Sequence, residues 1–186
     1  ADSRLCRQIH LPLQAGCDTT LRRMGRRITT AAFARLVTAA RERIPDVAIT
    51  TDVLVGFPGE DRLAFEKSYA FIEEMAFAKI HVFPYSERPN TPASSLPQQN
   101  AFHVKEERAR RVRHLAREQR QCYRRCFLGR ELPVLWEKRR GDGRWTGWTD
   151  NYLRVVSEAK QDLLNQITSA RILSVETGHL EGEAIL

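Results

Sequence analysis

The turn from Gly56 to Glu60, which reads GFPGE, has the residue types of a ligand-binding loop. Gly56 lets the backbone approach a ligand closely, Pro58 stiffens the turn, and Gly59 can adopt a left-handed conformation that other residues resist. The turn lacks the lysine and hydroxyl of a phosphate-binding loop, which argues against a nucleoside triphosphate. On its own, the motif fits either a ligand site or a plain connection between a strand and a helix.

The cysteines do not complete a metal site in the sequence. Cys122 and Cys126 have the spacing of the first half of a cysteine triplet that binds an iron–sulfur cluster, but the third position is Gly129. Both thiols fall on the apolar stripe of a predicted helix, so we expect them to pack in the core as small hydrophobic groups. Cys6 and Cys17 have no metal-ligand partner at a usable spacing. Four cysteines are also too few for a disulfide scaffold.

The histidines and carboxylates show no Ser/His/Asp or paired-carboxylate arrangement that spacing alone can support. His81 lies within a strand pattern, where we expect a core histidine with satisfied hydrogen bonds. The sequence therefore predicts no self-sufficient catalytic group of residues.

The positive charge is concentrated in one segment. The net charge is +7, and residues 103–130 alone hold ten basic and three acidic residues. A basic stripe on one element is typical of proteins that bind a polyanion such as nucleic acid, although a solvated helix face would carry similar charge. No run of eighteen apolar residues and no signal-peptide pattern occurs, so we expect a cytoplasmic protein without membrane association.

Strand and helix patterns alternate in the first hundred residues. Asp18 is expected to cap the first helix, and Thr29 or Thr30 the second. This alternation predicts βαβ units with a parallel sheet, open or closed into a barrel, in which ligands bind at the carboxyl ends of the strands. The predicted elements are a strand at 5–13, helices at 19–27 and from 30 to just before Pro45, a strand at 47–55, a helix at 63–75 and a strand at 79–84.

The second half of the chain changes character. A proline-rich loop from Pro84 to Gln99 leads to a long, amphipathic and cationic helix at 104–127. After Gly129, short β-rich pieces are separated by glycine and aspartate turns. This pattern predicts a small, strongly bent antiparallel barrel of about 55 residues, with tryptophans in its core.

Four motifs occur in order along the chain: HLPLQAGCDTTLRRM, TTDVLVGFPGED, HVFPYSERPNTPA and GWTDNYLRV. Together they resemble the methylthiotransferases, radical S-adenosylmethionine enzymes that add a methylthio group to tRNA or to a ribosomal protein. The likeness covers nearly the whole chain. The last two motifs look most like the branch that modifies C2 of N6-threonylcarbamoyladenosine beside the tRNA anticodon, with the isopentenyladenosine branch as the alternative.

The resemblance implies an α/β fold. Residues 1–102 would be the C-terminal half of a radical S-adenosylmethionine (βα)6 barrel, residues 103–129 a basic connecting helix, and residues 130–186 a small all-β TRAM barrel similar to an OB fold. It also implies a parent protein with two [4Fe-4S] clusters, whose cysteines would precede Ala1. Because the chain opens without a methionine, directly in a strand pattern, we expect a portion of a longer enzyme that is inactive alone. The alternative from a different class is a non-catalytic RNA-binding module.

The resemblance also assigns candidate contacts to S-adenosylmethionine. The residues that match cofactor-facing positions of the family are His10, Pro12, Gln14, Gly16, Gly56, Phe57, Gly59, Glu60, Tyr85, Ser86 and Arg88. Ala15 stands where serine is common, which removes a hydroxyl donor beside Gln14. Asn90 stands where glycine is common, and asparagine tolerates a left-handed backbone.

The expected partner is tRNA, held at its anticodon loop. Arginines of the long helix and of the RRMGRR segment would neutralise phosphates, and the barrel would offer cations and aromatic faces to unpaired bases. The candidate RNA contacts are Arg22, Arg23, Arg26, Arg27, Arg110, Arg111, Arg113, Arg117, Lys138, Arg139, Arg140, Trp145, Trp148, Asn151 and Tyr152. A ribosomal protein substrate is disfavoured because the basic helix suits phosphates. A truncated barrel would leave an unpaired strand edge at Leu5–Leu13, so we also expect self-association.

Overall fold

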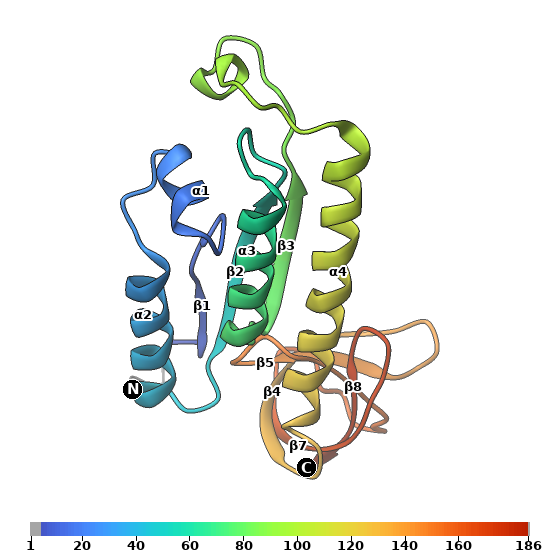
Figure 1. Ribbon diagram of the computed structural model, residues 1–186. Helices are drawn as coiled ribbons and strands as arrows, with labels where there is room; N and C mark the ends of the chain where they lie inside the picture. The colour runs from blue at the N-terminus through green and yellow to red at the C-terminus, as the bar shows by residue number, and fades with distance from the viewer. Residues whose placement is uncertain (1–4, 186) are drawn as a thin grey trace. The chain divides into compact units, whose positions relative to one another are not determined.

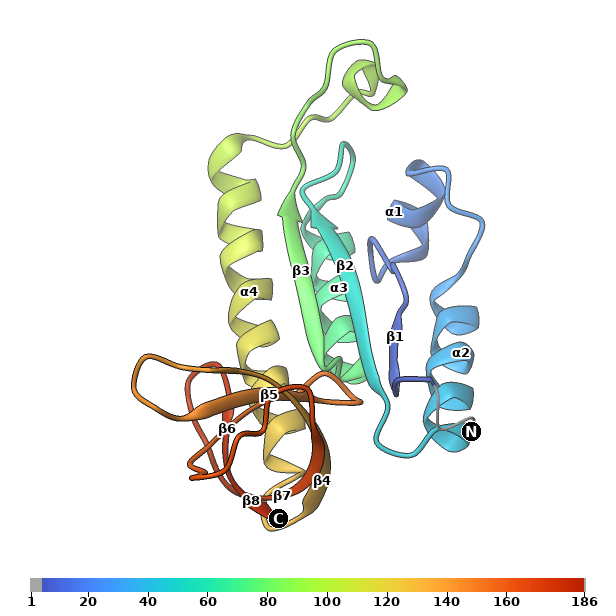
Figure 2. The same ribbon diagram turned by 180° about the vertical axis from the view of Figure 1, so that it is seen from behind.

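The computed structural model describes residues 5–185, which form a mixed α/β fold of two compact units (Figure 1 and Figure 2). Residues 9–43 and 49–120 make up the first, called the sheet unit. The second, called the barrel unit, contains residues 121–185, the segment 44–48 and the described residues before Ile9.

The sheet unit is built on strands β1 (Gln8–His10), β2 (Ala48–Val55) and β3 (Lys79–Pro84), which lie in the order β1-β2-β3. β2 and β3 are parallel, and an isolated parallel bridge joins Gln14 to Val53 beyond the end of β1. Because the strands run in the same direction, the segments that follow them meet at one edge of the sheet. The GFPGE turn after β2 lies at this carboxyl edge.

Helices cover one face of this sheet. The helices are α1 (Asp18–Arg23), α2 (Thr30–Arg43), α3 (Arg62–Met75), the short 3-10 helix η1 (Pro92–Ser95) and α4 (Phe102–Arg125). Figure 1 shows α3 in front of β2 and β3, and Figure 2, the reverse view, shows the opposite face of these strands. Thr51, Val53 and Val55 of β2 are at most 2% exposed, whereas Asp52 and Leu54, which alternate with them, are half-buried. The second set therefore lies on the open face.

Most local signals for these elements are confirmed, with three corrections. The helix predicted at 19–27 ends earlier, since α1 spans Asp18–Arg23. Thr29 caps α2, since its Oγ1 accepts a hydrogen bond from the amide of Ala32 at 3.2 Å. Asp18 does not cap α1 as predicted, because its Oδ1 accepts from the amide of Thr30, the first residue of α2, at 2.7 Å. The strand predicted at 5–13 is limited to Gln8–His10. The left-handed backbone of Asn90, with φ of 65°, is confirmed.

The barrel unit contains a closed barrel with strand order β4-β5-β6-β8-β7. Its strands are β4 (Glu131–Arg139), β5 (Trp145–Thr149), β6 (Arg154–Ser157), β7 (Ile167–Val175) and β8 (Leu180–Ile185). Trp136, Trp145 and Leu163 are part of its core, at most 5% exposed. The expected antiparallel pairing is wrong at one place: β6 and β8 pair in parallel, through Val155 with Leu180 and Val156 with Glu181. β8 was not foreseen, because its sequence is interrupted by Gly182 and two glutamates.

The two cysteines near the end of α4 are exposed, so the prediction that they pack in the core is wrong. α4 ends at Arg125, and Cys126 lies in the following turn, where its thiol donates to the carbonyl oxygen of Cys122 at 3.3 Å. The apolar stripe holds earlier in the helix, where Ala109, Val112 and Leu115 are at most 4% exposed.

Candidate functional site

The GFPGE turn at the carboxyl edge of the sheet is braced by its own glutamate. Glu60 is 2% exposed, and its Oε2 accepts hydrogen bonds from the amide of Gly56 at 2.6 Å and from Nη1 of Arg108 at 2.9 Å. Burial raises the pKa of the Glu60 carboxyl, and the Gly56 amide and Arg108 oppose this rise. The Glu60 side chain, a predicted cofactor contact, is thus already occupied within the protein.

The glycines of the turn make room for side chains of the same unit. Gly56 and Gly59 have φ of 74° and 80°, so both need the conformational freedom of glycine. A Cβ atom at Gly56 would lie 2.6 Å from Lys105, and one at Gly59 would collide with the guanidinium of Arg23. Arg23 itself donates to the carbonyl oxygen of Pro58 at 3.0 Å. Lys105 of α4 and Arg23 of α1 therefore pack closely against the turn.

The segment after β1 holds a strained residue at the same edge. Gln14 is half-buried with φ of 72°, a conformation that costs a non-glycine residue about 1–2 kcal/mol. Backbone hydrogen bonds with Asp52 and Leu54, both of 2.8 Å, hold it in place. Gly16, another predicted contact, has a packing role, because a Cβ atom there would lie 2.6 Å from the carbonyl oxygen of Ser68.

Polar side chains form a row on the open face of the sheet. His10 contacts Thr50 through Nδ1 at 2.9 Å and Asp52 through Nε2 at 3.3 Å. The ring of His81 on β3 lies 6.4 Å from that of His10. His81 is exposed, so its prediction as a core histidine is wrong. Its pKa is lowered by desolvation and by the charge of Lys79. The row can donate and accept hydrogen bonds beside the carboxyl edge.

Tyr85, which follows β3, provides the test of whether a ligand fits this edge. It is 8% exposed, and its hydroxyl is buried without a hydrogen-bond partner among the described residues. Its ring contacts that of Phe57 at 5.4 Å, and desolvation raises its pKa. An unpaired buried hydroxyl is costly unless a further group satisfies it. Among the predicted cofactor contacts, Tyr85 therefore has a hydroxyl available to a ligand, whereas the Glu60 carboxylate is already engaged by Gly56 and Arg108.

The remaining candidates for this site are solvent-facing. Pro12, Ser86 and Arg88 are all exposed.

Within residues 5–185, no three His, Cys, Asp or Glu side chains lie close enough to form a metal site. The same part of the chain contains no helix with the length and apolar character needed to cross a membrane.

The candidate RNA contacts of the sheet unit divide into free and engaged arginines. Arg111 makes a two-pronged ion pair with Glu66, at 2.6 and 2.8 Å, and its guanidinium also lies 4.8 Å from the ring of Phe65. Arg113 lies 3.8 Å from Glu106. Of these candidates, the exposed arginines whose side chains have no ion pair or hydrogen bond within residues 5–185 are Arg22, Arg26, Arg27, Arg110 and Arg117. Arg23 is also exposed, but its guanidinium donates to the carbonyl oxygens of Pro58 and Pro97.

In the barrel unit, the structure keeps most candidates on the surface and removes two. Asn151 is 1% exposed, and its Nδ2 donates to the hydroxyl of Tyr123 at 3.1 Å, so we withdraw it as an RNA contact. Trp145, at 5% exposure, belongs to the core. The candidates that remain exposed are Lys138, Arg139, Arg140 and Tyr152, and Trp148 is half-buried.

Sequence reasoning missed several residues that the structure adds. Arg108 braces Glu60, and Thr146, Arg154 and His179 line a hollow on the outside of the barrel. The exposed Arg154 lies with its guanidinium 5.5 Å from the ring of Trp148. A strand pattern that places Arg154 beside an aromatic residue on the next strand could have indicated this contact.

Comparison with known proteins supports the family suggested by the motifs. Residues 1–72 match the model of the radical SAM superfamily. The chain is 33% identical over 186 residues to the threonylcarbamoyladenosine tRNA methylthiotransferase MtaB of Bacillus subtilis, covering 98% of the chain and 41% of that protein. The MtaB protein of Thermotoga maritima is 36% identical over 186 residues, covering 97% of the chain and 43% of that protein.

A second group of relatives carries a different name. The tRNA-2-methylthio-N(6)-dimethylallyladenosine synthase of Acetivibrio thermocellus is 35% identical over 184 residues, covering 98% of the chain and 38% of that protein. The chain thus spans about two fifths of the length of the curated relatives it matches.

These matches make the chain similar to the radical SAM superfamily over residues 1–72 and to tRNA methylthiotransferases over nearly its whole length.

Proposed function

We propose that this chain supplies the RNA-holding barrel and part of the cofactor-binding sheet of a tRNA methylthiotransferase. The observation that carries the proposal is the continuous similarity to tRNA methylthiotransferases over 97–98% of the chain, which includes both compact units. On this proposal, strands β4–β8 are a TRAM domain, and β1–β3 belong to a radical S-adenosylmethionine barrel.

The proposed substrate is a modified adenosine beside the tRNA anticodon. The identities of 33% and 36% to the threonylcarbamoyladenosine enzymes, and of 35% to a dimethylallyladenosine enzyme, do not separate the two branches. We put threonylcarbamoyladenosine first because of the motifs HVFPYSERPNTPA and GWTDNYLRV, and keep the other adenosine as the alternative.

The carboxyl edge of the sheet would hold S-adenosylmethionine. When bound beside a reduced iron–sulfur cluster, this cofactor supplies the radical that activates the adenosine. Gln14 and His10 would present polar groups to the cofactor, and Phe57 with Tyr85 would form an apolar wall carrying one unsatisfied hydroxyl. Glu60 and Arg108 would keep the GFPGE turn in shape behind that wall.

The test is to express the whole gene that encodes this chain in bacteria deleted for their own tRNA methylthiotransferases. Mass spectrometry of tRNA nucleosides should then detect the methylthio derivative of threonylcarbamoyladenosine. Appearance of the dimethylallyladenosine derivative alone would select the alternative substrate. Absence of both products, with the protein present and its iron–sulfur content measured, would contradict the enzymatic proposal.

A matched pair of variants relates the product to the carboxyl edge. His10→Ala removes a side chain of the open face and should reduce the methylthio nucleoside by about tenfold or more. His114→Ala removes an exposed histidine of α4 and should leave the product unchanged. Equal product from both variants would remove His10 from the proposed site.

A further inference from the structure

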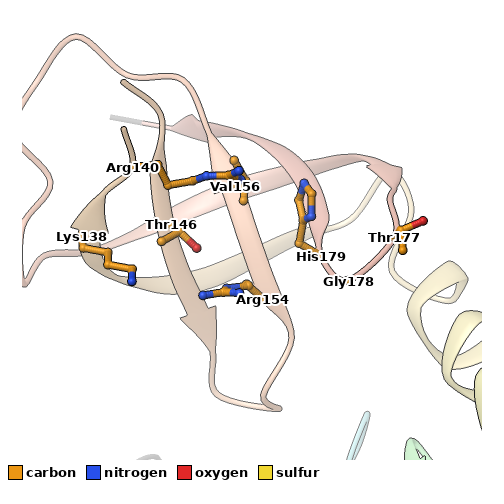
Figure 3. Close-up of a pocket in the computed structure, with 8 residues that line it drawn as sticks. All are labelled: Lys138, Arg140, Thr146, Arg154, Val156, Thr177, Gly178 and His179. Carbon is orange, nitrogen blue, oxygen red and sulfur yellow. The ribbon is translucent and has the colours of Figure 1, made fainter. Parts of the chain in front are cut away.

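A hollow of about 380 Å³ lies on the outside of the barrel (Figure 3). Figure 3 shows Thr146 near its centre, with the side chains of Lys138, Arg140, Arg154 and His179 around it. The hollow lies entirely within the barrel unit. Its lining combines three cations, Lys138, Arg140 and Arg154, with two threonines and a histidine, and none of its described lining residues is acidic.

The register of the strands explains why these residues converge. Thr146 of β5 pairs with Lys138 of β4 on one side and with Val156 of β6 on the other. Neighbouring positions along a strand face opposite sides, and Trp145 and Val155 point into the core. Thr146 and Val156 therefore lie on the outer face of the barrel, yet they are only 3% and 1% exposed. They form the floor of the hollow.

The hydroxyl of Thr146 is the first indication of a ligand. It is buried and has no hydrogen-bond partner within the described residues. Leaving a buried hydroxyl unpaired costs about 1–3 kcal/mol. An acceptor that enters the hollow would remove this cost, so the floor is suited to an oxygen-rich group.

The charges around the hollow indicate whether this oxygen-rich ligand group is an anion or a cation. Lys138 and Arg154 are exposed and have no acidic partner within residues 5–185, and Arg140 has only a 3.5 Å contact with Asp142 at the exposed rim. The nearby carboxylate of Glu181 is already bound to His179 at 2.7 Å and to Arg144 at 2.8 Å. The unneutralised cations favour an anion in the hollow.

An aromatic surface continues from the hollow on the same outer face. Trp148 lies two residues beyond Thr146 on β5 and pairs with Arg154 of β6, whose guanidinium lies 5.5 Å from the Trp148 ring. The ring of Tyr152, which is 60% exposed, lies 6.5 Å from that of Trp148. Exposed aromatic rings beside cations are the means by which proteins stack unpaired bases.

We propose that this face is a subsite for one nucleotide of single-stranded RNA, with its phosphate in the hollow and its base on Trp148 and Tyr152. The inference rests on the RNA-binding function proposed above and names the residues that perform it in the barrel. The Thr146 hydroxyl donates a hydrogen bond to a phosphate oxygen, and Lys138 and Arg154 neutralise the phosphate charge. Arg154 lies between the two parts of the subsite, because it lines the hollow and also contacts the Trp148 ring.

The test measures binding of a fluorescent anticodon stem-loop RNA to the chain over a series of salt concentrations. Lys138→Gln and Arg154→Gln should each weaken binding about tenfold and lower the salt slope by about one. Thr146→Val keeps the size of the side chain and should weaken binding about tenfold without changing the slope. Trp148→Ala should weaken binding at least about fivefold.

Arg171→Gln, which alters an exposed arginine of the same barrel paired with Glu131, is the control and should bind as the parent chain does.

The outcomes separate this inference from the proposed function. If the parent chain binds the stem-loop but Lys138→Gln and Arg154→Gln behave like Arg171→Gln, the subsite is overturned and RNA binding stands. A parent chain without salt-dependent RNA affinity contradicts the RNA-binding function itself. In that case, nuclear magnetic resonance with adenosine monophosphate shows whether the Thr146 and Arg154 amides still respond to a nucleotide. Competition by an acidic peptide equal to that by RNA would overturn the assignment to RNA.

Discussion

Glu60 and Arg108 form a buried ion pair in the sheet unit, with 2.9 Å between Oε2 and Nη1 and side chains that are 1% and 10% exposed. The pair connects the GFPGE turn to α4. Removing one partner of such a pair leaves an uncompensated buried charge, which costs about 3–5 kcal/mol, whereas removing both can be nearly neutral.

Arg108→Met should therefore destabilise the sheet unit by about 3–5 kcal/mol at neutral pH. The folded pKa of Glu60 lies above the ordinary value of 4.5, so the folded state holds this proton more tightly than the unfolded state. The protonated Glu60 carboxyl therefore contributes stability that is fully present below pH 4.5 and is lost as the pH rises through the raised pKa. The penalty should consequently shrink as the pH falls towards 5. Urea unfolding followed by circular dichroism measures it.

The double variant Glu60→Gln with Arg108→Met is the control for that measurement. It removes both charges, and it should recover most of the lost stability. An Arg108→Met penalty that is equal at pH 5 and pH 7, or that persists in the double variant, would contradict a charge-based role for the pair.

Asp46 is expected to carry an acid-sensitive part of the stability of the barrel unit. Its carboxylate binds Arg130 at 3.0 Å and Arg7 at 3.4 Å, and the hydrogen bond from Arg130 is the main reason its pKa is lowered. A lowered pKa gives stability that is present above the ordinary value of 3.8 and is lost as pH falls through the folded value. Asp46→Asn should cost about 1 kcal/mol at pH 7, because the groups are partly exposed.

The same variant should lose less stability to acid than the parent chain below about pH 4. Tryptophan fluorescence is the suitable probe, since all three tryptophans lie in the barrel unit. Glu158→Gln is the matched control, because it alters an exposed carboxylate of the same unit that has no ion pair within residues 5–185. Identical acid unfolding of Asp46→Asn and the parent chain would refute the prediction.

Asn151 and Tyr152 are neighbours with different expected roles. Asn151→Ala removes buried hydrogen bonds to Tyr123 and to Thr149, so it should destabilise the barrel unit by about 1–3 kcal/mol. Tyr152→Ala removes an exposed ring and should leave stability unchanged while weakening RNA binding about fivefold or more. Thermal unfolding and RNA titration of both variants give the comparison. A folded Asn151→Ala chain that loses RNA affinity at full stability would return Asn151 to the RNA contacts.

Self-association of the isolated chain is the fourth prediction. β1 is an edge strand, and Phe83 on β3 is 50% exposed. Sedimentation at increasing concentration should show dimers or larger species, which Phe83→Glu should reduce. Leu63→Glu, which alters a 64% exposed residue of α3, is the control and should not change the association. A parent chain that stays monomeric at high concentration would contradict the prediction.

The parts of the fold that depend on local pattern could be predicted from the sequence. The strand from Lys79 to Pro84 was predicted with the same bounds, because Ile80, Val82 and Phe83 are residue types that favour a strand and Pro84 marks its end. β8 was missed, because its strand state comes from pairing with β6 and β7 and not from its own residues. The hydrogen bond of Asp18 is a similar case. Its carboxylate accepts from the amide of Thr30 and not from its own helix, and this depends on a turn that the sequence pattern does not predict.

The candidate sites show the same division. The GFPGE turn and the aromatic residues of the barrel were identified from residue types. The structure keeps Trp148 and Tyr152 on the outer face of the barrel but places Trp145 in its core. The bracing of Glu60 by Arg108 joins residues 48 positions apart, and the hollow around Thr146 needs the register of three strands. Contacts of this kind follow from tertiary packing, which neither propensity nor spacing specifies.

The parallel pairing of β6 with β8 makes a seam in the barrel wall, joined at only two positions of the register. Val156 on one side of this seam and His179 on the other both line the hollow. A phosphate bound between them would hold β6 and β8 together, so separation of these two strands and release of the RNA would occur together. Amide hydrogen exchange at Val155 and Leu180 should accordingly slow when RNA is bound, while exchange between β4 and β7 on the opposite wall stays the same.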